Sequence, residues 1–357
     1  MKIRALTFHV DPELLKGDLS RFSPTLSDLI NDVYGKFGIE IWTKRLALAP
    51  QPARRVAMIA EKLERGLSDE IDYIAIPIVN ANEDDIPKIL EVLSMHRRIF
   101  ISLSGNEVQL RVFQKLLELI LNRLSPEHFV KVSFSIKSHI LTPYFPAASA
   151  VKGRIGVSAA LLYVGNLVSA LRNNGSLTAE IKACYNAAMC ILNFISNKLS
   201  IDNFGIDLSI SPWMDDSVAR LIEMVSGEDF YEPATYHAIF KLNEGIREIV
   251  NEDFKCIGFN EVMLPYAEDS RLMELGKEGK LTAYNLLSLS AVCVAGFDMA
   301  VLPKMSSKIL RNFLLDIYAL LKSKGKPSGI RVVLTENEPG EMADLGFLGR
   351  APVMKLK

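Results

Sequence analysis

Cysteine and histidine are scarce in this chain of 357 residues, which contains four cysteines and five histidines. No two cysteines form a Cys-x-x-Cys pair, and no histidine clusters with Cys184, Cys190, Cys256 or Cys293. Close spacing of that kind is typical of zinc sites, and disulfide frameworks are typical of short cysteine-rich secreted chains, so both classes of site are disfavoured. The apolar neighbours of the four cysteines predict buried thiols in a reducing cytoplasm.

The sequence also lacks an excess of charge of either sign, because 41 basic residues stand against 42 acidic ones. A dominant nucleic-acid-binding surface is therefore disfavoured, and we expect no nucleic-acid partner. The most apolar stretch, residues 283–302, contains Asn285 and Asp298, which disfavours a membrane-spanning helix of roughly 20 residues. The N-terminal segment is typical of a β-strand rather than a signal peptide, so we expect a cytoplasmic protein without a membrane partner.

Several nucleotide-binding and catalytic motifs are absent. The chain contains no Gly-x-Gly-x-x-Gly after a strand pattern, no phosphate-loop lysine, no Gly-x-Ser-x-Gly and no His-Glu-x-x-His. We therefore expect neither a nicotinamide nor a flavin cofactor, and a serine-hydrolase mechanism is disfavoured.

Strand patterns and helix patterns alternate along almost the whole chain. The predicted strands cover residues 3–10, 39–48, 73–79, 98–103, 129–136, 204–210, 256–264, 298–302 and 330–334. The predicted helices cover 54–67, 84–95, 107–124, 157–172, 178–199 and 306–322, with others starting near 215, 270 and 283. This alternation predicts an α/β fold with a parallel sheet, as an open doubly wound sheet or as a closed barrel. The tail from Thr335 is predicted to be coil.

No Gly-, Ser- or Pro-rich linker divides the chain, and no repeat of fixed period appears. We therefore predict a single α/β domain over residues 1–357, with a helical insertion or oligomer-contact region at about 155–200. Two apolar segments, 159–164 and 189–194, fall in adjacent predicted helices of that region. An exposed apolar patch usually marks an interface, so we expect a homo-oligomer.

Polar residues that follow predicted strands are the candidates for a functional site, because ligands bind at the carboxyl ends of strands in parallel α/β folds. Asp207 and Glu261 are predicted to act as catalytic acid–base groups or as ligands of a divalent cation. A buried carboxylate such as Asp207 can equally hold loop amides in place. Further candidates for substrate binding are Thr142, Asp216, Ser217, Glu268 and Asp269. Those at helix starts can equally serve as N-caps.

Two further expectations concern the charges of this site. The clustered carboxylates predict a carboxylate-rich pocket in which at least one group titrates high or binds a cation. Arg45 lies within a strand pattern, and a guanidinium there requires a carboxylate or phosphate partner. Two alternatives remain open for Arg45: a structural ion pair with Asp207 or Glu261, or substrate binding.

Four segments of the chain resemble a known family. They are residues 142–148 (Thr-Pro-Tyr-Phe-Pro-Ala-Ala), 207–209 with 216–219, 262–265 with 268–269, and 290–298 with Leu302-Pro303; the matching order continues through 326–327 and 340–344. The chain thereby resembles the domain-of-unknown-function 711 family of bacterial and archaeal proteins. The resemblance implies a fold like the ten-stranded α/β barrel of pyruvate formate-lyase and its glycyl-radical relatives, and it implies no established reaction.

Our leading hypothesis is therefore a metabolic enzyme that binds a small polar or anionic metabolite in an α/β barrel of about ten strands with surrounding helices. A non-catalytic metabolite sensor and an oligomeric scaffold are the alternatives. Glycyl-radical chemistry is not expected despite the implied barrel. The glycine-containing tail at 345–350 does not match a radical-site segment, and no two cysteines are adjacent.

Overall fold

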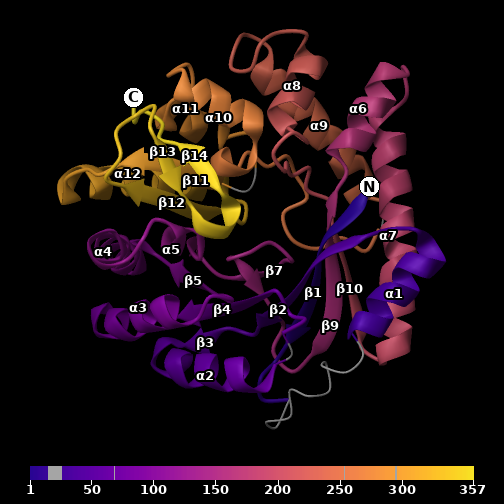
Figure 1. Cartoon of the computed structure of the whole chain (residues 1–357). Helices are drawn as coiled ribbons and strands as arrows, with labels where there is room; N and C mark the ends of the chain where they lie inside the picture. The colour runs from indigo at the N-terminus through magenta and orange to yellow at the C-terminus, as the bar shows by residue number, and fades with distance from the viewer. Residues whose placement is uncertain (15–25, 68, 253, 294–295) are drawn as a thin grey trace.

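The computed structural model describes residues 1–14, 26–67, 69–252, 254–293 and 296–357. Across these ranges the chain forms a mixed α/β fold with a ten-stranded, mostly parallel sheet and twelve α-helices. Figure 1 shows α2 (Val56–Gly66), α3 (Ile86–Met95) and α4 (Glu107–Arg123) stacked along one flank of the sheet, and the long α7 (Leu177–Leu199) along the other. The sheet is therefore enclosed by helices on both flanks.

The strands of the sheet run in two directions. They are β1 (Lys2–Val10), β2 (Ile41–Leu48), β3 (Gln51–Pro52), β4 (Tyr73–Val79), β5 (Ile99–Gly105), β6 (Val132–Ile136), β9 (Ile155–Leu162), β10 (Asp202–Asp207), β11 (Gly296–Pro303) and β12 (Gly329–Thr335). Their hydrogen-bonded order is β10-β9-β1-β2-β4-β5-β6-β12-β11, with β3 on β4. The block from β1 to β6 is parallel. A parallel pair that runs the opposite way is added antiparallel at each side of this block.

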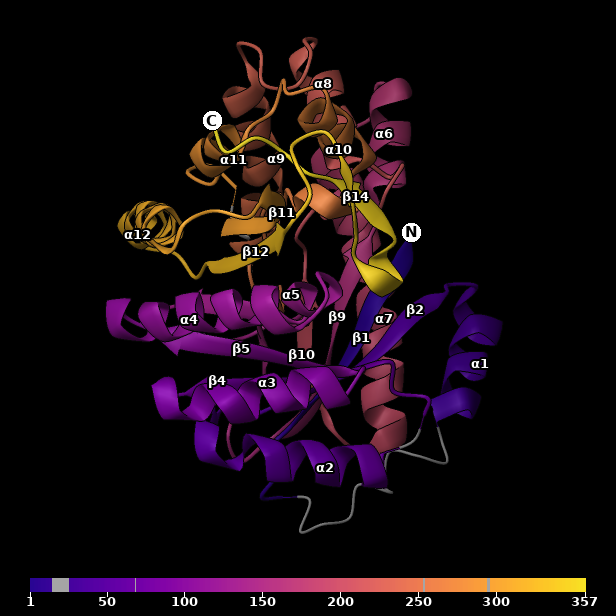
Figure 2. The same ribbon diagram turned by 60° about the vertical axis from the view of Figure 1, so that its left-hand side comes forward.

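The remaining helices complete the outer layer. They are α1 (Leu26–Phe37), α5 (Glu127–Val130), α6 (Val164–Arg172), α8 (Val218–Ser226), α9 (Thr235–Val250), α10 (Ser270–Lys277), α11 (Ala283–Leu289) and α12 (Ser307–Lys324). Several helices begin at side-chain N-caps, and the caps of α4, α7 and α12 are Asn106, Ser176 and Ser306. Figure 2 shows helices α8 to α11 gathered at the end of the molecule opposite α2.

The two faces of the parallel strands carry side chains of different size. On β5, Leu103 belongs to the main hydrophobic core, while the neighbouring Ser102 points to the inner side, where its hydroxyl bonds His139 Nδ1 at 3.2 Å. On β6, Ser133 and Ser135 alternate with larger apolar residues. Large side chains therefore pack under the helices, and the concave inner face is lined by small ones.

The space beside these small residues is occupied by residues 137–153, which we call the inserted loop. It contains the short strands β7 (Ile140–Leu141) and β8 (Ala148–Ser149). Its β8 packs against Ala47 of β2 and Ala75 of β4, in a small cluster separate from the main core. The alanines on the inner face thus leave the room that the backbone of the inserted loop requires.

The main hydrophobic core is continuous, because one cluster of buried side chains runs from Ile3 of β1 to Met354 near the C-terminus. This continuity supports the proposed single domain. Among the described residues, no helix combines the length and the apolar character needed to cross a membrane.

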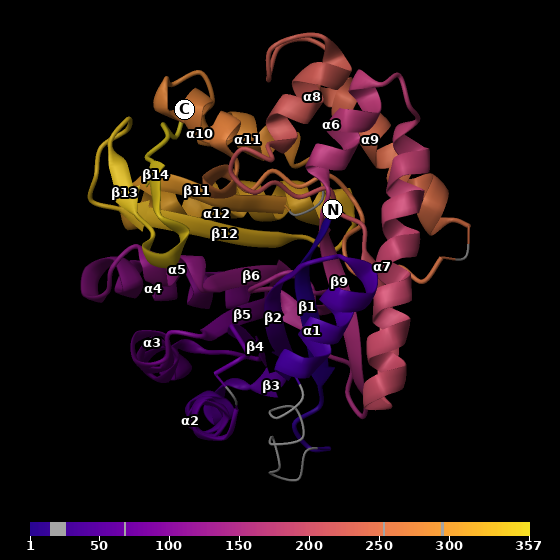
Figure 3. The same ribbon diagram turned by 45° about the vertical axis from the view of Figure 1, so that its right-hand side comes forward.

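Most predicted elements are confirmed, with ends shifted by a few residues, but the predicted helix over 157–172 is wrong in its first half. Residues Ile155–Leu162 form β9, which pairs antiparallel with β1, and only Val164–Arg172 form a helix. Figure 3 shows β9 between β1 and the long α7. A short continuous apolar run fits a buried strand as well as a buried helix, and here pairing with β1 decides.

Two further predictions of secondary structure also differ from the structure. Residues 256–264, predicted to be a strand, make only isolated bridges to the β10 side, and Gly258 within them has a positive φ of 81° that interrupts a regular ladder. The tail, predicted to be coil, forms a hairpin of β13 (Met342–Asp344) and β14 (Arg350–Pro352), with Phe347 near its tip.

The apolar segments that suggested an oligomer contact are covered by this chain only in part. Residues 159–162 are buried within β9, and Ile191 and Leu192 of α7 are buried, whereas Met189 and Phe194 are half-buried and Cys190 is exposed. Homo-oligomer formation stays a prediction, as does the cytoplasmic location.

A glycine in β10 provides a test of the inner packing. Gly205 has a φ of 111°, and an added Cβ would lie 2.2 Å from the carbonyl oxygen of Lys255. Gly205→Ala should therefore lower the free energy of unfolding by about 2 kcal/mol or more, measured by urea denaturation. The control is Gly35→Ala in α1, where an added Cβ meets nothing within 4 Å. It should raise the free energy of unfolding by about 0.5–1 kcal/mol. Equal effects of the two substitutions would contradict this packing.

Candidate functional site

The inner side of the sheet encloses a cavity of about 330 Å³. Its wall includes Arg4 of β1, Tyr73 of β4 and Phe100 of β5, which lie in the amino-terminal halves of their strands, and Arg45 just past the middle of β2. We expected the site at the carboxyl ends of the strands; the cavity meets this expectation at β10, whose following loop supplies Ser211 and Trp213, but in the parallel block it lies nearer the amino ends. The inserted loop fills the space toward those carboxyl ends, which leaves the cavity at the amino ends.

The cavity wall is unusually aromatic. Eight of its 24 residues carry aromatic rings, against 8% of the whole sequence. They are Trp42, Tyr73, Phe100, Tyr144, Phe145, Trp213, Phe259 and Phe347. Both tryptophans of the chain are among them, and their ring centroids lie 4.7 Å apart. An enclosed apolar space with a few convergent polar groups is typical of a small-molecule site.

Four charged side chains of the wall form one network. Glu268 accepts hydrogen bonds from Arg4 and from Arg331 Nη2, the latter at 3.0 Å. Asp298 accepts from Arg331 Nε at 2.6 Å and Nη2 at 2.9 Å. Burial alone would raise the pKa of Glu268, but Arg4 and Arg331 hold that pKa below the usual 4.5. Two cations and two carboxylates therefore neutralise one another inside the protein.

Arg4 reaches this network because β1 is irregular at that point. The register of β1 against β9 shifts between Ile3 and Ala5, which is a bulge, and bulges redirect side chains. The Arg4 guanidinium also donates to Pro212 O at 2.5 Å. It lies near the ring of Trp213, with its central carbon 5.8 Å from the ring centroid. Arg4 is thus held in place by an ion pair, a carbonyl and an aromatic face.

Arg45 is bound differently. Its Nε donates to Thr43 Oγ1 at 2.9 Å, and its guanidinium lies near two rings, with its central carbon 5.6 Å from the centroid of Tyr73 and 5.1 Å from that of Phe145. Its Nη1 and Nη2 groups donate no hydrogen bond to any other described residue. The residue is only 9% exposed and is part of the cavity wall.

No described carboxylate lies in direct contact with Arg45, although Glu268 favours its charged form from a longer distance. Neither Asp207 nor Glu261 pairs with it, and no other described carboxylate forms an ion pair with it. Burial, together with the nearby Arg4, lowers the pKa of Arg45 to about 10, which keeps the guanidinium charged at neutral pH. The first alternative for Arg45, a structural ion pair with Asp207 or Glu261, is therefore not found in the described part of the chain.

Asp207 lies outside the cavity wall and holds loop amides. Its Oδ1 accepts from Ser209 Oγ at 2.6 Å and from Asn260 N at 3.1 Å, and its Oδ2 accepts from Phe259 N at 2.9 Å. A Cβ added at Gly258 would lie 1.9 Å from Oδ2, so the loop wraps closely around the carboxylate. Burial raises the pKa of Asp207, and these donors act against that rise. The contacts support the structural alternative, and a catalytic role stays a prediction.

Glu261 lies in a second location, on the side of the molecule near the end of α12. It is 3% exposed and pairs with Lys326, with Lys324 at 3.7 Å and with Arg247 at 3.9 Å. It does not belong to the residues that line the cavity. Three cations around one buried carboxylate explain how Glu261 is tolerated there, and its predicted catalytic role is untested.

Ser217 and Asp269 join the starts of two helices. Ser217 Oγ caps α8 by accepting from Arg220 N at 3.0 Å, and it donates to Asp269 Oδ1 at 2.6 Å. Asp269 also accepts from Ala219 N at 3.1 Å and from Leu272 N at 3.2 Å. These contacts match the N-cap alternative, and neither side chain lines the cavity.

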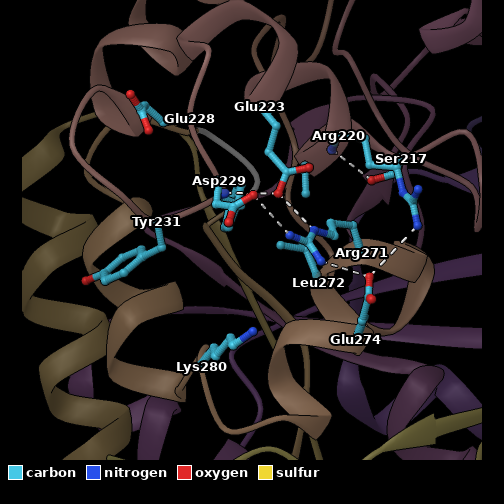
Figure 4. A network of polar contacts seen from close by, with 12 residues as sticks. Ser217, Arg220, Glu223, Glu228, Asp229, Tyr231, Arg271, Leu272, Glu274 and Lys280 are labelled. Atoms are coloured by element: carbon cyan, nitrogen blue, oxygen red, sulfur yellow. Dashed lines mark hydrogen bonds and ion pairs between the residues drawn. The ribbon is translucent and has the colours of Figure 1, made fainter.

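The ion pairs next to these caps lie toward the surface. Figure 4 shows Arg271 between carboxylates of neighbouring elements, with its Nε bonded to Glu223 at 2.8 Å and its Nη1 to Glu274 at 3.0 Å. Glu274 is 46% exposed, which separates this network from the buried one around Glu268. The pairs of Arg271 are therefore screened by water.

Thr142 and Asp216 also lie outside the cavity wall. Thr142 is buried and donates to Asp207 Oδ2 at 3.2 Å, while Asp216 is exposed. Of the eight predicted site residues, only Arg45 and Glu268 line the cavity. The expected convergence of carboxylates in one pocket is thus not what the structure shows, because most of them satisfy backbone amides or cations of their own surroundings.

No group of three or more His, Cys, Asp or Glu side chains within the described ranges is arranged to hold a metal ion. All four cysteines are free thiols. Burial raises the pKa of Cys293 to about 11, so this thiol is protonated at neutral pH.

Sequence reasoning missed the other three members of the charged network around Glu268. Arg4, Asp298 and Arg331 each interrupt an apolar strand pattern, which is the same signal that singled out Arg45. A charged residue at such a position must find a partner or a ligand inside the fold. Applying this argument to every strand would have identified the whole charged set.

The buried network predicts a large stability effect at Glu268. Glu268→Gln removes one of two carboxylates that neutralise Arg4 and Arg331, so we expect the free energy of unfolding to fall by about 3–5 kcal/mol in chemical denaturation. The control is Glu274→Gln in the exposed network of Figure 4, which should cost about 1 kcal/mol or less. A loss at Glu268 no greater than that at Glu274 would contradict the network.

His9 predicts a pH dependence of stability. It is fully buried, its Nδ1 lies 2.8 Å from Ser149 O and its Nε2 lies 2.6 Å from Ser158 Oγ. Burial lowers the pKa of His9 from 6.5 to about 4. Between these values the unfolded chain binds the additional proton, so stability is complete above pH 6.5 and declines as the pH falls toward 4.

The contribution of His9 to this slope is about 1.4 kcal/mol per pH unit. We expect His9→Asn to make the pH dependence of the free energy of unfolding shallower by about that amount between pH 6 and 4.5, measured in urea. His237→Asn, at an exposed position of α9, is the matched control. An unchanged slope in His9→Asn would show that His9 is not buried in its neutral form.

Comparison with known proteins places these observations in a family. The model of the family described as "Uncharacterised ACR (DUF711)" matches residues 13–346. A "UPF0210 protein" of Sulfurisphaera tokodaii is 25% identical over 397 aligned positions, which cover 99% of this chain and 87% of that protein. "UPF0210" proteins of Leuconostoc mesenteroides and Methanopyrus kandleri are 30% and 29% identical. Those two alignments cover 44% and 45% of this chain and 37% of each relative. The chain belongs to the DUF711 family, as its sequence motifs indicated.

Proposed function

We propose that this protein binds a small anionic metabolite in the inner cavity and acts on it as an enzyme. The single observation that carries the proposal is the uncompensated guanidinium of Arg45 in the cavity wall. A buried guanidinium without a counter-ion is unfavourable by several kcal/mol, and an anionic ligand would supply the missing partner. The cavity volume of about 330 Å³ suits a small metabolite.

The other charged residues of the cavity wall support the same proposal because their charges cancel. Arg4 and Arg331 are neutralised by Glu268 and Asp298, so they do not attract a second anion. Their network fixes the wall beside the ligand without adding net charge. Arg45 is thus left as the ligand's charge partner.

Catalysis on the bound anion is the second part of the proposal. Asp298 and Tyr144 are wall residues that could exchange protons with a ligand. Burial raises the pKa of Asp298 above the usual 3.8, against the opposing effect of Arg331. Burial also raises the pKa of Tyr144, and its hydroxyl donates to Ser211 Oγ at 3.1 Å. Recovery of every bound ligand unchanged after prolonged incubation would favour the sensor alternative instead.

We also propose that the curved sheet forms a barrel of the kind that the resemblance to glycyl-radical enzymes implies. The supporting contacts lie at its two edges. At one edge of the sheet, Cys256 forms an isolated bridge to β10, and Val262 forms one to the loop that follows β10. At the other edge, β11 accepts a hydrogen bond from Met354 N at 2.9 Å. Irregular segments thereby cover both edges where regular strands would close a barrel.

Binding can be tested with tryptophan fluorescence, because Trp42 and Trp213 are the only tryptophans and both line the cavity. Small carboxylates and phosphates should change the emission in a saturable manner, whereas their uncharged amide analogues should not. Arg45→Met keeps the apolar stem and removes the charge. It should weaken anion binding by about 30-fold or more.

The stability of the same variant separates a functional Arg45 from a structural one. Ligand-free Arg45→Met should unfold at the same or a higher denaturant concentration than the wild type, because an uncompensated charge has been removed. The control is Arg154→Met, which removes a guanidinium stacked on Phe204 and paired with Asp202 at the surface. If Arg45→Met destabilises the protein and no anion shows binding that depends on Arg45, the proposal is wrong.

A further inference from the structure

The chemistry of the cavity identifies the class of anion more closely, on the premise that the proposed function is correct. The charge balance comes first. The wall contributes three guanidinium groups and two carboxylates, all engaged with one another except Arg45. The excess is therefore one positive charge. A ligand with a single negative charge leaves the cavity neutral, whereas a dianion leaves an uncompensated negative charge in an apolar space.

The free hydrogen-bond donors of Arg45 also restrict the class of ligand. Because Nε is bonded to Thr43 Oγ1, the edge formed by Nη1 and Nη2 is the one left for a ligand. Two parallel N–H groups on a planar guanidinium match the two oxygens of a carboxylate. The free edge of Arg45 is therefore suited to one carboxylate bound through both of its oxygens.

The surroundings of Arg45 come third. The rings of Tyr73 and Phe145 both contact the guanidinium of Arg45. Phe100 stands 5.2 Å from Tyr73 and 5.7 Å from Phe145, and Phe347 of the C-terminal hairpin stands 5.5 Å from Tyr73. These four side chains form a continuous aromatic wall beside the free guanidinium edge. Such a wall favours a flat ring over a flexible chain, through edge-to-face and offset contacts.

We infer that the ligand of this cavity is a small aromatic monocarboxylate, with its carboxylate on Arg45 and its ring against Tyr73, Phe100, Phe145 and Phe347. The carboxylate replaces the missing counter-ion, and the ring replaces water against the aromatic wall. Phe347, at the tip of the hairpin and 37% exposed, acts as a specificity residue that closes the wall from the solvent side.

Four probes test this ligand class by isothermal titration calorimetry of the full chain. They are benzoate, the saturated cyclohexanecarboxylate, the uncharged benzamide, and phenyl phosphate in its dianionic form. Benzoate should bind about 10-fold more tightly than cyclohexanecarboxylate, through its ring contacts. It should bind at least about 30-fold more tightly than benzamide, through its charge. Phenyl phosphate should bind more weakly than benzoate.

Two variants connect these preferences to the wall. Arg45→Met should abolish the advantage of benzoate over benzamide. Phe347→Leu changes a partly exposed residue, so the fold is retained, and it should reduce the preference for benzoate over cyclohexanecarboxylate by about 5-fold or more. Val108→Leu, at an exposed position of α4 away from the cavity, is the matched control and should leave both affinities unchanged.

The outcomes separate this inference from the proposed function. If phenyl phosphate or cyclohexanecarboxylate binds as tightly as benzoate, and this binding depends on Arg45, the inferred ligand class of aromatic monocarboxylates is wrong. The proposed binding of anions at Arg45 is then retained. If benzoate and the other anions all fail to bind, and the tryptophan emission does not respond to any anion, both proposals are wrong. Benzoate binding that is unaffected in Arg45→Met would also overturn the inference, because the charge would then be recognised elsewhere.

Discussion

The burial of three guanidinium groups on the inner face of one sheet is the constraint on which the rest of this structure depends. Guanidinium groups stay charged in proteins, so each needs a partner when it is removed from water. Glu268 and Asp298 neutralise Arg4 and Arg331, and the bulge in β1 brings Arg4 within reach of that network. Arg45 has no such partner in the described chain, and this asymmetry gives the cavity its net charge.

The space around these charges follows from side-chain size. Large apolar residues occupy the outer face of the parallel strands, under the helices, and small ones occupy the inner face. The inserted loop fills one end of the inner space and is held there by His9 of β1 and by Ser102 of β5 through His139. Aromatic rings line the other end. A single charge is recognised more strongly in such surroundings than at a solvated surface.

The fold was predictable from sequence wherever the hydrophobic periodicity of a segment and its length indicated the same type of element. The alternation of strands and helices from β2 to α4, and again from β11 to β12, follows from such patterns, whereas α1 between β1 and β2 was not predicted. Prediction from sequence patterns failed at β9. Its short apolar run carries no periodicity, and only the pairing with β1 decides its conformation. The order of the strands, with the two outer pairs reversed, depends on long-range pairing that local patterns do not encode.

The site was predictable only in part, for a related reason. Arg45 was identified because a charge inside an apolar strand is conspicuous, whereas Asp207 gave the same signal and proves to bind backbone amides. Sequence shows that a buried charge needs a partner, and tertiary contacts determine which one.

The most direct test of an uncompensated Arg45 is anomalous X-ray diffraction from crystals soaked in sodium bromide. The account predicts a bromide ion within hydrogen-bonding distance of the Arg45 Nη groups. A crystal structure in which a carboxylate of the chain occupies that position would contradict it.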